Sequence, residues 1–94
     1  MLEYKLGYFA RSLCGHDKNR LYMIVDIDGD MIGLSDGRLR PLSRPKYKKK
    51  KHIQLIRSEK TAAEFETIKR SGDPDQAVRA EVSARQKPTR DQED

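Results

Sequence analysis

The stretch RLYMIVDIDGDMIGLS, residues 20–35, decides the fold of this protein. Its two apolar segments, residues 20–27 and 30–35, are too short for helices and are rich in the β-branched and aromatic residues that favour strands. They are separated by Asp28-Gly29, a dipeptide favoured in the type I′ turn of two-residue hairpins. The sequence therefore predicts a tight antiparallel hairpin, whose first strand is the longest in the chain.

Three shorter strands are predicted around this hairpin, at residues 7–13, 38–42 and 52–56. In the segment 38–42, alternation places Leu39 on a buried face, with its two arginine neighbours on the other face. Five short strands separated by turn signals favour a small barrel or a sandwich, and we choose the barrel because closure removes exposed edges. The expected fold class is mainly β, a five-stranded barrel with a short C-terminal helical appendage.

The chain changes character after Arg57. Of its 33 apolar residues, 24 lie in residues 1–57, and that part carries a net charge of +7, whereas the rest carries −2. Capping signals in the second part predict one helix over about residues 61–71 and a weaker one from Asp73 to about Gln86. The predicted organisation is a barrel, a helical appendage and a disordered tail, at residues 1–57, 58–86 and 87–94.

Several function classes are disfavoured by length and composition. With 94 residues the chain is one small domain with a tail, and a large multidomain enzyme is excluded. No apolar run has the roughly 18 residues of a membrane span or the form of a signal peptide, so we expect a soluble, cytoplasmic protein. Cys14 is the single cysteine, which agrees with a reducing compartment, and we expect a monomer when the protein is free.

The densest charge lies between residues 36 and 57, where nine basic residues face a single acidic one, Asp36. Such density attracts polyanions, and nucleic acid is the expected partner. Arg38 and Arg40 share a face of the predicted strand, and Tyr47 is the best candidate for stacking on an unpaired base. A solvated loop or a nuclear localisation signal is the alternative interpretation of the lysine run. The residues expected to contact RNA are Lys18, Arg20, Arg38, Arg40, Arg44, Lys46, Tyr47, Lys48, Lys49, Lys50, Lys51 and His52.

Catalytic and metal sites are weakly indicated. The aspartates of residues 26–30 lack the glycine and glutamate positions of an EF-hand loop, and one cysteine with two histidines falls short of a structural zinc site. Cys14 and His16 are close in sequence, but a barrel of this size leaves little room for a substrate pocket. We expect no catalytic residue, no metal and no cofactor.

Residues 7–25, followed by 36–40, 44–46 and 51–53, resemble the KOW motif of RNA-binding proteins related to large-subunit ribosomal proteins. The resemblance covers roughly residues 5–57. It implies a Src-homology-3-like barrel that binds RNA, with ribosomal RNA as the expected target and ribosomal proteins as further partners. Carried over onto this sequence, it points to Gly15, Asp17 and Lys18 in a loop and, near the basic surface, to Arg38, Arg40, Lys46 and His52. Gly15, Asp17 and Asn19 are expected to shape that loop, and Asn19 stands where the family usually has glycine. The alternative function is a protein-interaction module associated with the transcription or translation machinery.

Overall fold

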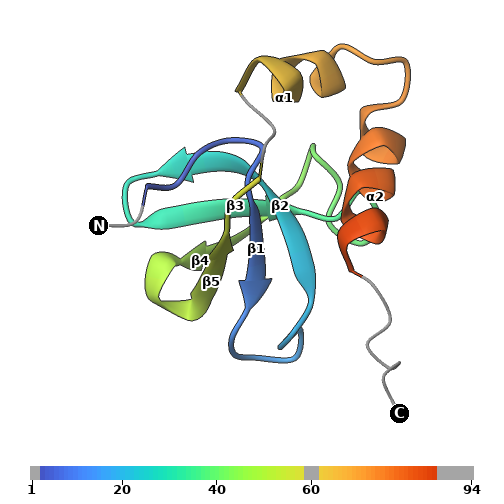
Figure 1. Ribbon diagram of the computed structural model, residues 1–94. Helices are drawn as coiled ribbons and strands as arrows, with labels where there is room; N and C mark the ends of the chain where they lie inside the picture. The colour runs from blue at the N-terminus through green and yellow to red at the C-terminus, as the bar shows by residue number, and fades with distance from the viewer. Residues whose placement is uncertain (1–2, 59–61, 87–94) are drawn as a thin grey trace.

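The computed structural model describes residues 3–58 and 62–86, and within them the fold consists of one β-sheet and two α-helices. Neighbouring strands are antiparallel, and the sheet has the order β4-β3-β2-β1-β5 (Figure 1). The elements are β1 (Phe9–Ser12), β2 (Leu21–Asp28), β3 (Met31–Ser35), β4 (Lys46–Lys49), a 3-10 turn η1 (Lys50–His52), β5 (Ile53–Ile56), α1 (Ala62–Lys69) and α2 (Pro74–Arg85).

The central hairpin confirms the prediction from residues 20–35. Strands β2 and β3 pair with Asp28 opposite Met31, so the turn consists of Gly29 and Asp30. Gly29 has a φ of 60°, whereas Asp30 is not among the residues with positive φ. The predicted type I′ turn is therefore wrong, because that turn needs positive φ at both central residues.

The strand predicted at residues 38–42 is also wrong. This segment is a loop, and Leu39, expected on a buried face, is 70% exposed. The cause is local: Asp36 Oδ1 accepts hydrogen bonds from the backbone N–H groups of Arg38 (2.8 Å) and Arg40 (3.0 Å). A side chain that captures backbone donors in this way competes with ladder pairing. The fourth strand lies instead at Lys46–Lys49, inside the basic segment.

The sheet is not the closed barrel that the sequence predicted. Strands β4 and β5 stand at opposite ends of the strand order, and within the described residues no pairing joins them. Edge β4 carries three lysines in four residues, and charged side chains protect an exposed edge without closure. One face of the sheet is covered by the helices, which supply a second layer of apolar contacts.

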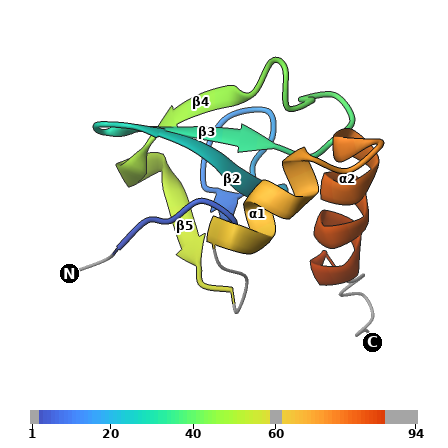
Figure 2. The same ribbon diagram turned by 90° about the horizontal axis from the view of Figure 1, so that it is seen from above.

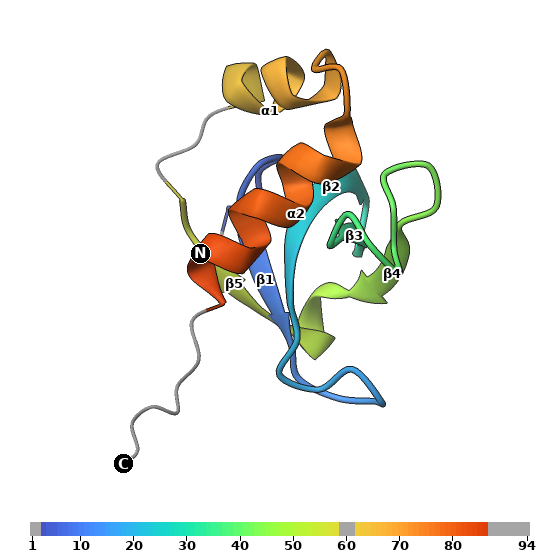
Figure 3. The ribbon, with the colours of Figure 1, turned by 90° about the vertical axis from the view of Figure 1, so that its right-hand side faces the viewer.

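Alternation along the strands divides the core into two clusters. One contains Ala10, Tyr22, Ile24, Ile32, Leu34 and Ile53. On the other face, Phe9, Leu21 and Met23 are buried against residues of both helices, namely Phe65, Val78 and Val82. Figures 2 and 3 show α1 and α2 on one side of the sheet, with α2 crossing β1 and β2. The helices expected as an appendage thus share a core with the sheet.

The start of α2 agrees with the capping pattern in the sequence. Asp73 Oδ1 accepts a hydrogen bond from the backbone N–H of Gln76 (3.2 Å), and Pro74 occupies the first helical position. The predicted cap of α1 at Thr61 and the predicted disordered tail at 87–94 lie outside the described residues.

Helix α2 holds the loop between β3 and β4. Arg79 Nη1 donates to the carbonyl oxygen of Gly37 (2.7 Å), and Asp75 Oδ1 accepts from the backbone N–H of Leu42 (2.8 Å). Gly37 has a φ of +73°, and a Cβ built on it would lie 2.2 Å from the carbonyl oxygen of Asp75. Only glycine therefore permits this contact between loop and helix.

We expect Gly37→Ala to destabilise the protein more than Gly29→Ala. Both glycines have positive φ, at a cost of about 1–2 kcal/mol for an alanine, but a Cβ at Gly29 would meet nothing within 4 Å. The clash at Gly37 should add at least about 1–3 kcal/mol. Urea unfolding of both variants measures the difference, and equal losses would contradict the tight packing of loop and helix.

Candidate nucleic-acid interface

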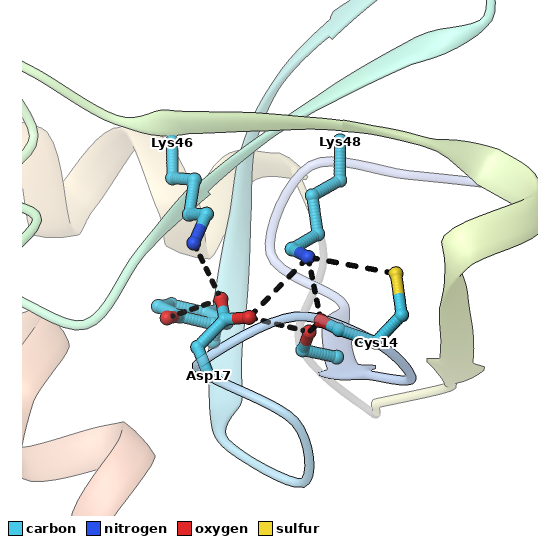
Figure 4. Close-up of polar contacts among 6 residues, drawn as sticks. Cys14, Asp17, Lys46 and Lys48 are labelled. Atoms are coloured by element: carbon cyan, nitrogen blue, oxygen red, sulfur yellow. Dashed lines mark hydrogen bonds and ion pairs between the residues drawn. The ribbon is translucent and has the colours of Figure 1, made fainter.

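The lysine run does not form one surface, because strand β4 turns its side chains alternately to opposite faces. Lys46 and Lys48 point toward Asp17, as Figure 4 shows. Tyr47 lies on the other face, opposite Gly33 of β3, and its hydroxyl donates to Asp26 Oδ2 at 2.5 Å. The predicted binding residues 46–48 are thus divided between two faces of the sheet.

Asp17 collects four donors beneath β4. Its Oδ2 accepts from the Tyr22 hydroxyl (2.8 Å) and lies 3.0 Å from Lys46 Nζ, while its Oδ1 accepts from Ser12 Oγ (2.9 Å) and lies 3.3 Å from Lys48 Nζ. The carboxylate side chain is only 8% exposed. A charge this buried is stabilised by the opposite charges and hydrogen bonds around it.

These contacts set the protonation of the cluster. Burial alone would raise the pKa of Asp17, but the hydrogen bonds from Lys46, Tyr22, Ser12 and Lys48 together hold this pKa well below its ordinary value. Burial, with the hydrogen bond to Asp17, raises the pKa of the Tyr22 hydroxyl above its ordinary value. Asp17 is therefore ionised at neutral pH and neutralises charge on β4.

Lys48 is a structural residue rather than a surface cation. Its side chain is 10% exposed, and besides Asp17 its ammonium donates to the carbonyl oxygen of Cys14 at 2.9 Å (Figure 4). Lys46 is 27% exposed, so part of its side chain still reaches the surface. Nothing in the sequence marked Asp17 as the counterion of these lysines, because the contacts span distant segments.

The loop that carries Asp17 has the backbone that the sequence predicted. Gly15 and Asn19 both have positive φ, 89° and 76°. The N–H of Asn19 donates to the carbonyl oxygen of Ser12 (2.8 Å), and that of Arg20 to the carbonyl oxygen of Asp17 (2.9 Å). Asn19 accepts the left-handed conformation that glycine usually supplies.

Three arginines gather where this loop meets the loop after β3. A cavity of about 180 Å³ is lined by His16, Asp17, Arg20, Tyr22, Leu39, Arg40 and Lys46. A second cavity, of about 340 Å³, is lined by Arg20, Leu21, Asp36, Arg38, Arg79, Val82, Ser83 and Gln86. Arg20 borders both cavities, so we treat them as one site and call it the arginine cleft.

The guanidinium groups of Arg20, Arg38 and Arg40 are free within the described parts of the chain. All three residues are exposed, and in residues 3–58 and 62–86 no side-chain hydrogen bond or ion pair is found for them. Their backbones are nevertheless held, by Asp17 and Asp36. Arginines on fixed backbones whose guanidiniums form no ion pair are suited to bidentate phosphate contacts.

The other predicted binding residues lie away from the cleft lining. Lys50 Nζ stands 4.9 Å from the centre of the Tyr4 ring, and His52 is half-buried, its carbonyl accepting from the N–H of Leu13. The exposed members of this group are Lys18, Arg44, Lys49 and Lys51.

Arg79 also lines the cleft. The sequence does not predict it as a site residue, because residues 58–86 are expected to form an appendage separate from the basic domain. A signal was present: Arg79 follows Val78 and precedes Val82 by three residues, so it borders the buried face of the helix.

Within the described residues, no group of three or more His, Cys, Asp or Glu side chains is placed to hold a metal ion. Cys14 is a free thiol with Lys48 Nζ 3.9 Å from its Sγ, while His16 lines the arginine cleft. Across the same residues, no helix has the length and apolarity needed to cross a bilayer.

No protein-family model matches the chain, and no curated protein matches it in sequence.

Proposed function

We propose that this protein binds RNA through the arginine cleft and carries out no reaction of its own. The observation that carries the proposal is the set of three exposed guanidiniums, those of Arg20, Arg38 and Arg40, on two loops whose backbones are held by aspartates. Guanidiniums that line one cleft attract phosphates over a distance and bind them by displacing counterions. The net charge of +5 and the exposed lysines elsewhere on the surface add to the attraction.

We also propose that the sheet is a Src-homology-3-like fold of the KOW type, that the RNA is ribosomal, and that the protein works in the cytoplasm. Support comes from the resemblance of residues 7–25 and 36–40 to the KOW motif, and from the positive φ of Gly15 and Asn19 in its loop. The meander of neighbouring antiparallel strands β1 to β4 is compatible with this fold.

The test compares two triple variants of the full chain that lose the same charge. One carries Arg20→Gln, Arg38→Gln and Arg40→Gln in the cleft. The control carries Lys49→Gln, Lys51→Gln and Arg57→Gln, at exposed positions outside the lining of both cavities. Affinity for a structured ribosomal RNA fragment is measured by fluorescence anisotropy at several salt concentrations.

We expect the cleft variant to lose most of its affinity, with the salt slope falling by about one for each arginine removed. The control should lose less, because its charges act only through the overall field. Equal losses of affinity in the two variants would show that the overall charge of the protein, and not the cleft, determines RNA binding. No binding by the unaltered protein would refute the proposal and favour a protein-interaction module.

A further inference from the structure

Leu39 is an exposed leucine on a rigid support. It is 70% exposed in the loop between β3 and β4, and its neighbours Arg38 and Arg40 are two of the three free arginines of the cleft. An isolated exposed leucine is ordinary, but this one lines the same cavity as Arg20, Arg40 and Lys46.

The loop is held on both sides of this leucine. Ser35 Oγ donates to the carbonyl oxygen of Arg40 (2.7 Å), and the same oxygen accepts from the N–H of Asp36 (3.1 Å). Across from these bonds, Arg79 of α2 donates to the carbonyl oxygen of Gly37. With its base closed in this way, the loop presents Leu39 to solvent at little further cost in backbone entropy on binding.

Within the described residues, the cleft offers unpaired bases no exposed tyrosine, phenylalanine or tryptophan on which to stack. Of these residue types, only Tyr22 lines the two cavities; it is buried, and its hydroxyl is bound to Asp17. His16 is the one exposed ring among the lining residues. Tyr47, the predicted stacking residue, lies on the opposite face of β4 from Lys46, with its hydroxyl on Asp26. Single-stranded RNA is usually recognised by stacking on exposed rings.

We propose that the arginine cleft recognises double-helical RNA and that Leu39 enters its minor groove while Arg38 and Arg40 contact the flanking phosphates. The inference rests on the proposed RNA-binding function and names its substrate class. The minor groove of an RNA helix is wide and shallow and displays sugars and base edges to a protruding side chain. Proteins that bind the minor groove of DNA likewise combine arginine contacts with an apolar side chain that enters the groove, where it wedges between base steps.

The test uses the full chain and an RNA duplex of about 16 base pairs, with one of its strands alone as the comparison ligand. Leu39→Ser removes the apolar side chain. Leu13→Ser is the matched control, because Leu13 is also exposed, at 44%, but lines neither cavity of the cleft. Both positions are at the surface, so urea unfolding should show small changes in stability for each.

We expect tighter binding to the duplex than to the single strand. Leu39→Ser should weaken duplex binding by roughly tenfold without changing the salt slope, since an apolar contact releases no counterions. Hydroxyl radicals attack riboses exposed in the minor groove, so the unaltered protein should protect a short patch that Leu39→Ser leaves open. Leu13→Ser should bind as the unaltered protein does.

Other outcomes separate this inference from the proposed function. If Leu39→Ser binds the duplex normally while the arginine triple variant does not, the groove contact is refuted and RNA binding stands. If the unaltered protein prefers the single strand, duplex recognition is likewise refuted, while RNA binding through the cleft stands. If the unaltered protein binds neither RNA, both proposals fail.

Discussion

A chain that ends at Arg57 is expected to be unfolded at room temperature, although it keeps all five strands. Without α1 and α2, the side chains of Phe9, Leu21 and Met23, now at most 2% exposed, would face water. Burial of one such side chain is worth about 1.5–3 kcal/mol, whereas a whole domain is stable by only about 5–15 kcal/mol. Far-UV circular dichroism and urea unfolding of the shortened chain measure the effect.

A point substitution tests the same contact in the complete chain. Phe65 of α1 is 1% exposed, and Phe65→Ala should lower the free energy of unfolding by about 3–5 kcal/mol. Thr67→Ala is the matched control, because Thr67 lies on the exposed side of the same helix and should change stability by less than about 0.5 kcal/mol. If the shortened chain unfolds cooperatively at the urea midpoint of the full chain, the helices are an appendage, as the sequence predicted.

Asp17→Asn is expected to destabilise the protein by about 3–5 kcal/mol, because it leaves the mostly buried ammonium of Lys48 without a counterion. Lys46 loses its ion pair as well, and an amide in place of the carboxylate weakens the hydrogen bonds from Ser12 and Tyr22. Asp26→Asn is the control, since within the described parts of the chain the Asp26 carboxylate accepts a hydrogen bond only from the exposed Tyr47. Equal losses in the two variants would show that Asp17 contributes no more than a surface aspartate.

The contribution of Asp17 should also depend on pH. Its pKa in the folded protein is depressed, so the stabilisation is fully present above the ordinary carboxyl pKa of about 4. It is lost progressively as the pH falls below that value toward the folded pKa. The stability difference between the unaltered protein and Asp17→Asn should therefore be constant from about pH 6 to 5 and shrink below about pH 4. A difference that persists unchanged at pH 3 would contradict this account.

Local signals predicted much of the backbone. The hairpin of residues 20–35, two of the three other predicted strands and the start of α2 at Asp73 all follow from patterns within a few residues. The positive φ of Gly15 and Asn19 is also predictable from a few neighbouring residues, because it depends on the turn itself. The failure at residues 38–42 is equally local in origin: alternation indicated a strand, but Asp36 took the backbone donors.

The candidate site could be predicted only in part. Sequence identified Arg20, Arg38 and Arg40 as basic residues near turns, but it placed the two later arginines on a strand and grouped them with the whole lysine run. Alternation along a strand predicts which of its side chains share a face of the sheet. It does not predict on which face a buried carboxylate from another segment will lie. The inward turn of Lys46 and Lys48 toward Asp17, and the approach of Arg79 to Gly37, join residues roughly 30 to 40 positions apart. Short-range propensity thus decided the strands and turns, whereas long-range packing decided which cations are neutralised inside and which remain free in the cleft.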